Sequence, residues 1–287
     1  MFESILVAVD EPAESDVVVE HARALAARFD ATLHVLHVVD VRRLDTVPES
    51  EQRREDAAAY VHDVAADVDA APEDVEEVVR TDVPADAIVG YATEAAVDLV
   101  VVGTHGRTGL EHVRVGSVAE AVVRDATVPV VTVPLAEDAR VAFPYDRVLV
   151  AADGSPEAMA AAEHAVGLAA ACDAAVDVLS VVETAALGAD VRSEILEAEL
   201  REHATEVVDE VVALADEASV AASTTVTSGV PRVAIREHVT ANDVDLVAMG
   251  THGRSGVDRL LLGSVAERTL RTTDVPVLTV RRPTDAE

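Results

Sequence analysis

The stretch "VDLVVVGTHGR" at residues 97–107 returns almost unchanged as "VDLVAMGTHGR" at residues 244–254. The similarity extends further, because residues 103–133 and 250–280 align without gaps and share 17 identities in 31 positions. A repeat with a period of about 145 residues is far too long for a solenoid. The chain therefore contains two copies of one domain.

The openings of the two copies also correspond, as "ILVAVDEPAES" at 5–15 and "VLVAADGSPEA" at 148–158. A polar segment with two prolines, "PLAEDARVAFPYDR" at 134–147, joins the copies. A chain of 287 residues is long enough for two ordinary domains. We place the boundary near residue 140 and predict domains at 1–139 and 140–287.

Each copy alternates short valine-rich runs with longer stretches of helical period. Runs such as "DLVVV" are apolar at consecutive positions, which is typical of strands buried on both faces of a parallel sheet. The pattern predicts an α/β fold of two tandem doubly wound domains, each a five-stranded parallel sheet with helices on both faces. The predicted strands are 4–10, 32–39, 75–80, 98–102, 128–133, 147–152, 175–182, 220–227, 244–249 and 275–280. The predicted helices are 14–29, 50–70, 84–95, 117–125, 156–172, 191–217, 231–241 and 264–273.

The last strand of each copy contains a proline, Pro129 in "VPVVTV" and Pro276 in "VPVLTV". Proline is tolerated at a sheet edge or a strand start, so the fifth strand is predicted to be an edge. An apolar edge strand usually needs a partner.

A glycine-rich loop follows the fourth strand with the same spacing in both copies, G-x2-G-x9-G-S. Eight of the chain's 13 glycines lie in these two loops. Glycine allows positive φ and lets backbone N–H groups approach an anion. A helix that starts at Gly-Ser adds orphan N–H donors and the positive end of its dipole. The loops are predicted to be phosphate cradles built mostly from neutral donors.

Two familiar phosphate motifs are missing from the sequence. The Walker A pattern is absent and the chain has no lysine, and no G-x-G-x-x-G occurs in the first βα turn. The alternative is that each loop only lets the chain cross the sheet edge. The identical spacing in two copies favours the functional interpretation.

These features resemble the universal stress protein family, over essentially the whole chain as a tandem. The resemblance rests on the glycine loop, the opening strand that ends in aspartate, "LHVV" in the second strand and the terminal "VPVxTV". It implies an adenine-nucleotide alpha hydrolase-like fold that binds ATP or the related AMP or ADP. It also implies pairing through the fifth strands, either between the two domains of one chain or in a homodimer.

The resemblance assigns binding roles position by position. Asp10 and Asp153 would lie beside adenine and ribose, with base contacts from Val38, Val181, Val102 and Met249. The ribose- and phosphate-binding residues would be Gly103, Gly106, Gly116, Ser117 and Val118, and Gly250, Gly253, Gly263, Ser264 and Val265. Arg107 and Arg254 would lie near the phosphates. A single aspartate per site could hold Mg²⁺ through water.

The two copies differ in the first turn. The second reads "DGSPEA", the family's usual form, whereas the first reads "DEPAES", with Glu11 and Pro12 replacing glycine and serine. The change adds a negative charge and removes a hydroxyl and a backbone donor. We therefore expect the second site to bind nucleotide more tightly than the first.

Several histidines raise the question of catalysis. His105 and His252 lie in the glycine loops, where a general base, a phosphoacceptor or a packing residue could stand, and we favour packing. His34 and His37 in the second strand are expected to face the same side, but they are weak indications of a metal because the second copy has Asp177 and Ser180 there. We expect no catalytic residue and no metal site built from protein ligands alone.

The charge is unusual: 54 acidic against 22 basic residues give a net charge of −32. Such a surface repels nucleic acid and anionic membranes. A chain with dispersed acidic residues and no lysine resembles the proteins of extreme halophiles, in which high salt screens the repulsion between like charges.

The sequence has no apolar run long enough to span a membrane and no secretory n-region, and its one cysteine fits a reducing cytoplasm.

The expected function is that of a cytoplasmic, nucleotide-binding stress-response regulator. Any ATP hydrolysis would be slow, because no positioned base is evident. One alternative is an enzyme, a slow ATPase or a nucleotidyl-transfer relative. The other is a ligand-free dimerisation scaffold, against which the intact loops argue.

Overall fold

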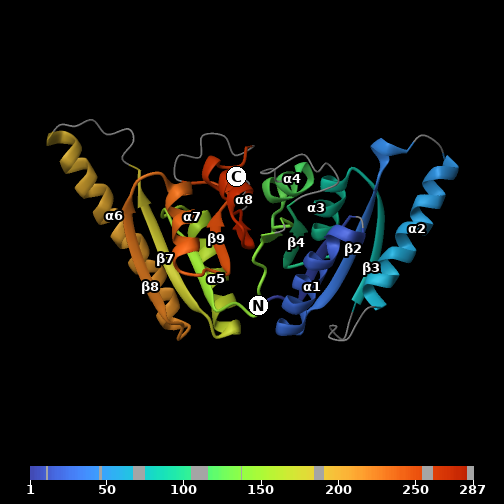
Figure 1. The fold of residues 1–287 in the computed structure, drawn as a ribbon, viewed down its shortest axis with the longest axis horizontal. Helices are drawn as coiled ribbons and strands as arrows, with labels where there is room; N and C mark the ends of the chain where they lie inside the picture. Colours follow the sequence, from blue (N-terminus) through green and yellow to red (C-terminus); the bar gives the residue numbers. More distant parts are fainter. Residues whose placement is uncertain are drawn as a thin grey trace. The chain divides into compact units, whose positions relative to one another are not determined.

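The computed structural model describes residues 1–10, 12–44, 47–66, 75–104, 116–136, 138–183, 191–253 and 261–282. They belong to two compact units, Met1–Phe143 and Pro144–Glu287. The boundary that we place after residue 139 lies four residues before this division. In Figure 1 the first unit runs from blue to green and the second from green to red.

The first unit is a parallel sheet of five strands in the order β3-β2-β1-β4-β5. Its elements are β1 (Ser4–Val9), α1 (Pro12–Phe29), β2 (Thr32–Asp40), the 3₁₀ helix η1 (Val41–Arg43), α2 (Val47–Ala66), β3 (Val75–Asp82), α3 (Pro84–Glu94), β4 (Leu99–Gly103), α4 (Ser117–Asp125) and β5 (Val130–Val133). The predicted α/β fold is confirmed, although η1 has no counterpart among the predicted elements.

The second unit repeats this arrangement in the order β8-β7-β6-β9-β10. Its elements are β6 (Arg147–Ala151), α5 (Pro156–Cys172), β7 (Ala175–Val182), α6 (Val191–Glu217), β8 (Ala222–Ser228), α7 (Pro231–Ala241), β9 (Leu246–Gly250), α8 (Ser264–Thr272) and β10 (Val277–Val280). In each unit taken by itself, the fifth strand is the last of the order.

Helices cover both faces of each sheet. The chain winds outward from β1 to β3 and then returns to β4 and β5, so right-handed crossovers place the first two helices on one face and the last two on the other. The helix pairs α3 with α4, α5 with α6 and α7 with α8 are in contact. The central strands are buried on both faces, as Ile5, Leu6 and Val7 in β1 show.

Matching hydrogen bonds bring the starts of the central strands together in both units. The carboxylate of Asp98 accepts from the backbone N–H groups of Glu3 and Ser4 at 2.7 and 3.0 Å. Asp245 accepts from Asp146 and Arg147 at 2.8 and 2.9 Å. The repeat in sequence is thus a repeat in detailed structure.

The expectation that His34 and His37 face the same side is wrong. His34 Nδ1 lies 2.7 Å from the hydroxyl of Tyr91 on α3, whereas the His37 ring packs edge-on against Tyr60 of α2, on the other face. Successive side chains of a strand alternate between its faces, so residues three apart point to opposite sides.

Candidate functional site

The predicted binding residues that the structure describes gather at the carboxyl ends of the strands, where doubly wound sheets bind ligands. Asp10 and Asp153 are exposed and follow β1 and β6, Val38 and Val181 are half-buried near the ends of β2 and β7, and Val102 and Met249 are buried in β4 and β9. The described loop residues are Gly103, Gly116, Ser117 and Val118, and Gly250, Gly253, Gly263, Ser264 and Val265. Gly106, Arg107, His105 and Arg254 lie outside the described residues.

One hydrogen-bond frame closes both loops. The N–H of Thr104 donates to the carbonyl of Val133, and the Thr104 carbonyl accepts from the N–H of Gly116. In the second unit Thr251 N–H donates to Val280 at 3.0 Å, and the Thr251 carbonyl accepts from Gly263 at 2.9 Å. Each helix start is therefore fixed beside the end of the fourth strand.

Two glycines of the second loop, Gly253 and Gly263, are needed for space rather than for positive φ. Gly116 and Gly263 have φ of −60° and −59°, in the range open to any residue. A Cβ on Gly263, however, would lie 2.8 Å from the Thr251 carbonyl oxygen, and one on Gly253 would lie 2.6 Å from Asp153 Oδ2. The expectation of positive φ is thus wrong for these glycines, whereas the close approach of the Thr251 carbonyl and the Asp153 carboxylate explains Gly263 and Gly253.

The starts of α4 and α8 present unsatisfied backbone donors. Their N-cap residues are Gly116 and Gly263, and neither makes a side-chain capping hydrogen bond. The first N–H groups of a helix have no intrahelical partner and carry the positive end of the dipole. Both loops therefore offer an anion several aligned N–H donors.

The first βα turn of the second unit is tied to its glycine loop. Asp153 Oδ1 accepts from the N–H of Ser155 at 2.9 Å. The Ser155 hydroxyl accepts from the N–H of Ala158 at 3.2 Å and donates to the carbonyl of His252 at 3.3 Å. Ser155 thus caps α5 and anchors the loop at the same time.

His252 holds the loop from inside. Its ring is buried, with Nδ1 3.0 Å from the Thr251 hydroxyl and Nε2 2.7 Å from the carbonyl oxygen of Leu261. Both ring nitrogens therefore contact the loop itself. This geometry supports packing rather than general-base catalysis for this histidine.

The first unit lacks the Ser155 anchor. Pro12, the residue at that position, is the first residue of α1, and it offers neither a hydroxyl nor a backbone N–H to Asp10. The two glycine loops are thus supported differently.

Sequence reasoning missed His203 on α6. Gly154 has a φ of +79°, and a Cβ there would lie 2.7 Å from Val207 Cγ2 and 3.3 Å from His203 Nε2. Positive φ and the neighbouring helix both require glycine at this turn. His203 lies far from the motifs along the chain, so no local pattern indicates its place beside the site.

Within the described ranges, no three histidine, cysteine or acidic side chains are grouped so that they could hold a metal ion. None of the described helices is long and apolar enough to cross a membrane.

Comparison with known proteins decides the family. The model of the universal stress protein family matches residues 1–134 and, a second time, residues 144–281. The chain belongs to the universal stress protein family. A universal stress protein of Mycobacterium tuberculosis is 30% identical over 305 residues, covering 97% of both chains. Another, from Methanocaldococcus jannaschii, is 36% identical over 142 residues, which are 48% of this chain and 84% of that relative.

Among solved structures, a universal stress protein from Archaeoglobus fulgidus superposes with a TM-score of 0.75 at 22% identity, covering 98% of this chain and 99% of the other. At that identity the likeness shows the fold alone. The mycobacterial relative, matched along nearly its whole length, shows that this universal stress protein shares a tandem organisation with others.

Proposed function

We propose that this universal stress protein binds ATP, or the related AMP or ADP, at the carboxyl edge of the sheet in one or both units. The observation that carries the proposal is the repeated loop frame, in which Thr104 and Thr251 fix the uncapped starts of α4 and α8. A nucleotide needs an anion site beside a surface for its base and ribose. The aspartate after the first strand and the half-buried valine of the second strand lie at the same edge.

In the second unit Asp153, Val181 and Met249 would contact base and ribose, and the loop residues with Arg254 would surround the phosphates. In the first unit Asp10, Val38, Val102 and the loop with Arg107 would do the same. Magnesium would arrive with the phosphates, because the described residues include no group of three histidine, cysteine or acidic side chains that could hold it alone.

The second unit is proposed as the tighter site. The Ser155 hydroxyl holds its glycine loop through the carbonyl of His252 and also caps the start of α5, without any bound ligand. Ordering a loop on binding costs free energy, so a preorganised loop binds more tightly. Pro12 cannot provide that support, and Glu11 would add a negative charge to the same turn of the sequence.

We further propose that the protein acts as a cytoplasmic stress-response regulator through its ligand state, rather than by steady turnover. The packing of His252 supports a role without steady turnover, since the described hydrogen bonds of its two ring nitrogens go to Thr251 and Leu261 of its own loop. The fifth strands would pair, within one chain or between two chains. The net charge of −32 suits a high-salt interior.

The test begins with protein purified in high salt without added nucleotide. Heat denaturation should release AMP, ADP or ATP into the supernatant, and adding ATP to the emptied protein should raise its melting temperature. Protein that carries no nucleotide and is not stabilised by ATP would contradict the proposal.

A further inference from the structure

The two repeats differ on the α3 and α7 faces of their sheets. Sheet register makes the comparison direct. Arg80 on β3 is the register partner of Val38, and Thr227 on β8 is the register partner of Val181, the matching valine of the second repeat. Arg80 and Thr227 therefore occupy equivalent positions.

The helices that follow are equivalent too. α3 and α7 each have 11 residues and begin at a proline, Pro84 and Pro231. Counting from these prolines, Tyr91 corresponds to His238 and Glu94 to Ala241. The first unit thus has Arg80, Tyr91 and Glu94 where the second unit has Thr227, His238 and Ala241.

In the first unit an arginine side chain fills this position. The guanidinium carbon of Arg80 lies 5.3 Å from the centroid of the Tyr91 ring, and Nη2 donates to Glu94 Oε2 at 2.8 Å. The Tyr91 hydroxyl is held by His34 Nδ1 at 2.7 Å. The guanidinium thus has an aromatic ring fixed below it and a carboxylate at its edge.

In the second unit the same position is an open groove of about 360 Å³ between α7 and the outer strands. The groove is lined by the three residues that stand in place of the arginine, the aromatic ring and the carboxylate, namely Thr227, His238 and Ala241. Glu237, one turn from Ala241 on α7, also lines the groove and supplies a carboxylate. The groove therefore keeps a ring and an acid but lacks the arginine.

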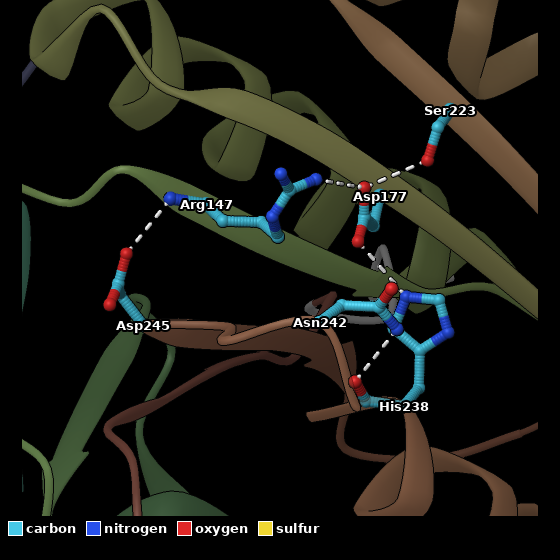
Figure 2. Close-up of polar contacts among 6 residues, drawn as sticks. All are labelled: Arg147, Asp177, Ser223, His238, Asn242 and Asp245. Carbon is cyan, nitrogen blue, oxygen red and sulfur yellow. Dashed lines mark hydrogen bonds and ion pairs between the residues drawn. The ribbon is translucent and has the colours of Figure 1, made fainter. Parts of the chain in front are cut away.

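The ring of His238, which lines this groove, contacts the carboxylate of Asp177 (Figure 2). His238 Nε2 lies 3.0 Å from Asp177 Oδ2, while Asp177 Oδ1 accepts from Arg147 Nη1 at 2.9 Å and from the Ser223 hydroxyl at 2.8 Å. Burial raises the pKa of Asp177, but the hydrogen bonds from Ser223 and His238 and the charge of Arg147 outweigh it, so the pKa lies below its usual value. An ionised carboxylate only accepts, so Nε2 of His238 carries the proton. Asp177 thereby fixes the orientation of the ring that lines the groove.

We propose that this groove binds the guanidinium group of an arginine side chain presented by a partner protein. The His238 side chain, which is 12% exposed, would stack on the guanidinium, while Glu237 would supply a carboxylate and Thr227 a hydroxyl acceptor. The occupant is inferred from the first repeat, where an arginine of the chain itself takes the equivalent place. The acidity of the whole chain favours a cationic partner.

The partner is a protein rather than a free guanidinium compound. Stacking and one exposed ion pair are each weak, so together they are worth roughly tenfold in affinity. Such a contact selects arginine within a larger interface. This inference does not rest on nucleotide binding, although Thr227 is the register partner of Val181, one of the proposed base-contacting residues.

The test is an NMR titration of the full chain with N-acetyl-arginine amide at high concentration, because chemical shifts report even a weak local contact, with N-acetyl-lysine amide as the matched probe at the same ionic strength. The arginine probe should shift the amide signals of Thr227 and His238, with at least a severalfold smaller response to lysine. Equal responses to the two probes, or no response at these residues, would overturn the proposal.

Two variants check the position. Thr227→Arg supplies the arginine from the chain itself and should abolish the response, while the rest of its spectrum reports an intact fold. Glu237→Gln, which leaves the groove open, should weaken the response severalfold. Shifts of wild-type size in a folded Thr227→Arg protein would show that the probe binds elsewhere.

Discussion

The hydroxyl of Ser155 donates to the carbonyl oxygen of His252 at 3.3 Å, which joins the first βα turn of the second unit to a loop 97 residues later. The same hydroxyl accepts from the N–H of Ala158 and so caps α5. Pro12 occupies this position in the first unit and can do neither. One side chain thus distinguishes the support of the two glycine loops.

Transferring the turn should transfer the support. In the double variant Glu11→Gly with Pro12→Ser, the first unit gains a hydroxyl and loses a charge, so its affinity for ATP should increase severalfold. Calorimetric titration in a Gly263→Val background isolates this site. The reciprocal change Ser155→Ala should lower the free energy of unfolding by about 1 kcal/mol, the usual cost of losing an N-cap. An unchanged affinity of the grafted site would argue against the role of the turn.

The glycines that end the fourth strands should tolerate alanine unequally. A Cβ on Gly250 would lie 2.8 Å from the backbone nitrogen of Ala158, so the start of α5 must move. A Cβ on Gly103 would meet Leu135 Cδ1 at 2.9 Å, the end of a side chain that can rotate away. We expect Gly250→Ala to cost about 1–3 kcal/mol and Gly103→Ala clearly less, measured by chemical denaturation. A larger loss of stability for Gly103→Ala than for Gly250→Ala would show that the backbone contact of Gly250 does not decide the cost.

Acid should destabilise the protein through His21. Burial lowers the pKa of this histidine on α1 to about 4 from the usual 6.5. Between these values the unfolded chain binds a proton that the folded protein does not, so stability falls as the pH decreases from 6.5 to 4 and then levels off. The effect amounts to about 3 kcal/mol.

The test for His21 compares wild type with His21→Leu across that pH range, because the difference removes the contribution of the many carboxylates. The variant should lose less stability than wild type on acidification. His62→Gln is a control whose effect lies at higher pH, since the hydrogen bond and charge of Glu77 raise the pKa of the exposed His62, and the resulting stability is lost as the pH increases above 6.5. Parallel pH curves for wild type and His21→Leu would refute the assignment.

Salt should stabilise the fold. With a net charge of −32, self-repulsion acts over about 10 Å at 0.1 M salt but only about 3 Å at 1 M. We expect the melting temperature to rise by roughly 5 °C or more between 0.1 and 2 M KCl, or about 2 kcal/mol. A non-ionic osmolyte at matched osmolality separates screening from exclusion effects. A melting temperature independent of KCl would contradict the proposed high-salt adaptation.

Local patterns in the sequence were enough to predict most of the fold. Helix α5 begins and ends where proline, serine and the alanine-rich run predict, and the buried valine runs mark the central strands. The short helix η1 could not be predicted, because it depends on a cap in which Asp40 accepts from the N–H of Arg42 at 3.0 Å.

The site was only partly predictable, for a different reason. Motif spacing predicts which residues line the carboxyl edge, but the contacts of Ser155 with His252 and of Asp177 with His238 join distant segments. Such pairs depend on sheet register and helix placement. The difference between Arg80 in the first repeat and Thr227 in the second can likewise be recognised only when β3 and β8 are aligned through their pairing with β2 and β7.

Nucleotide binding is tested by calorimetric titration with ATP in high salt, carried out on wild type, Gly116→Val and Gly263→Val. Each valine would obstruct one helix start, beside Thr104 or Thr251. We expect that wild type binds ATP, that Gly263→Val removes the tighter binding event, and that Gly116→Val leaves it in place. Equal losses in the two variants would contradict the asymmetry, and a wild-type protein that binds no ATP would contradict the central claim.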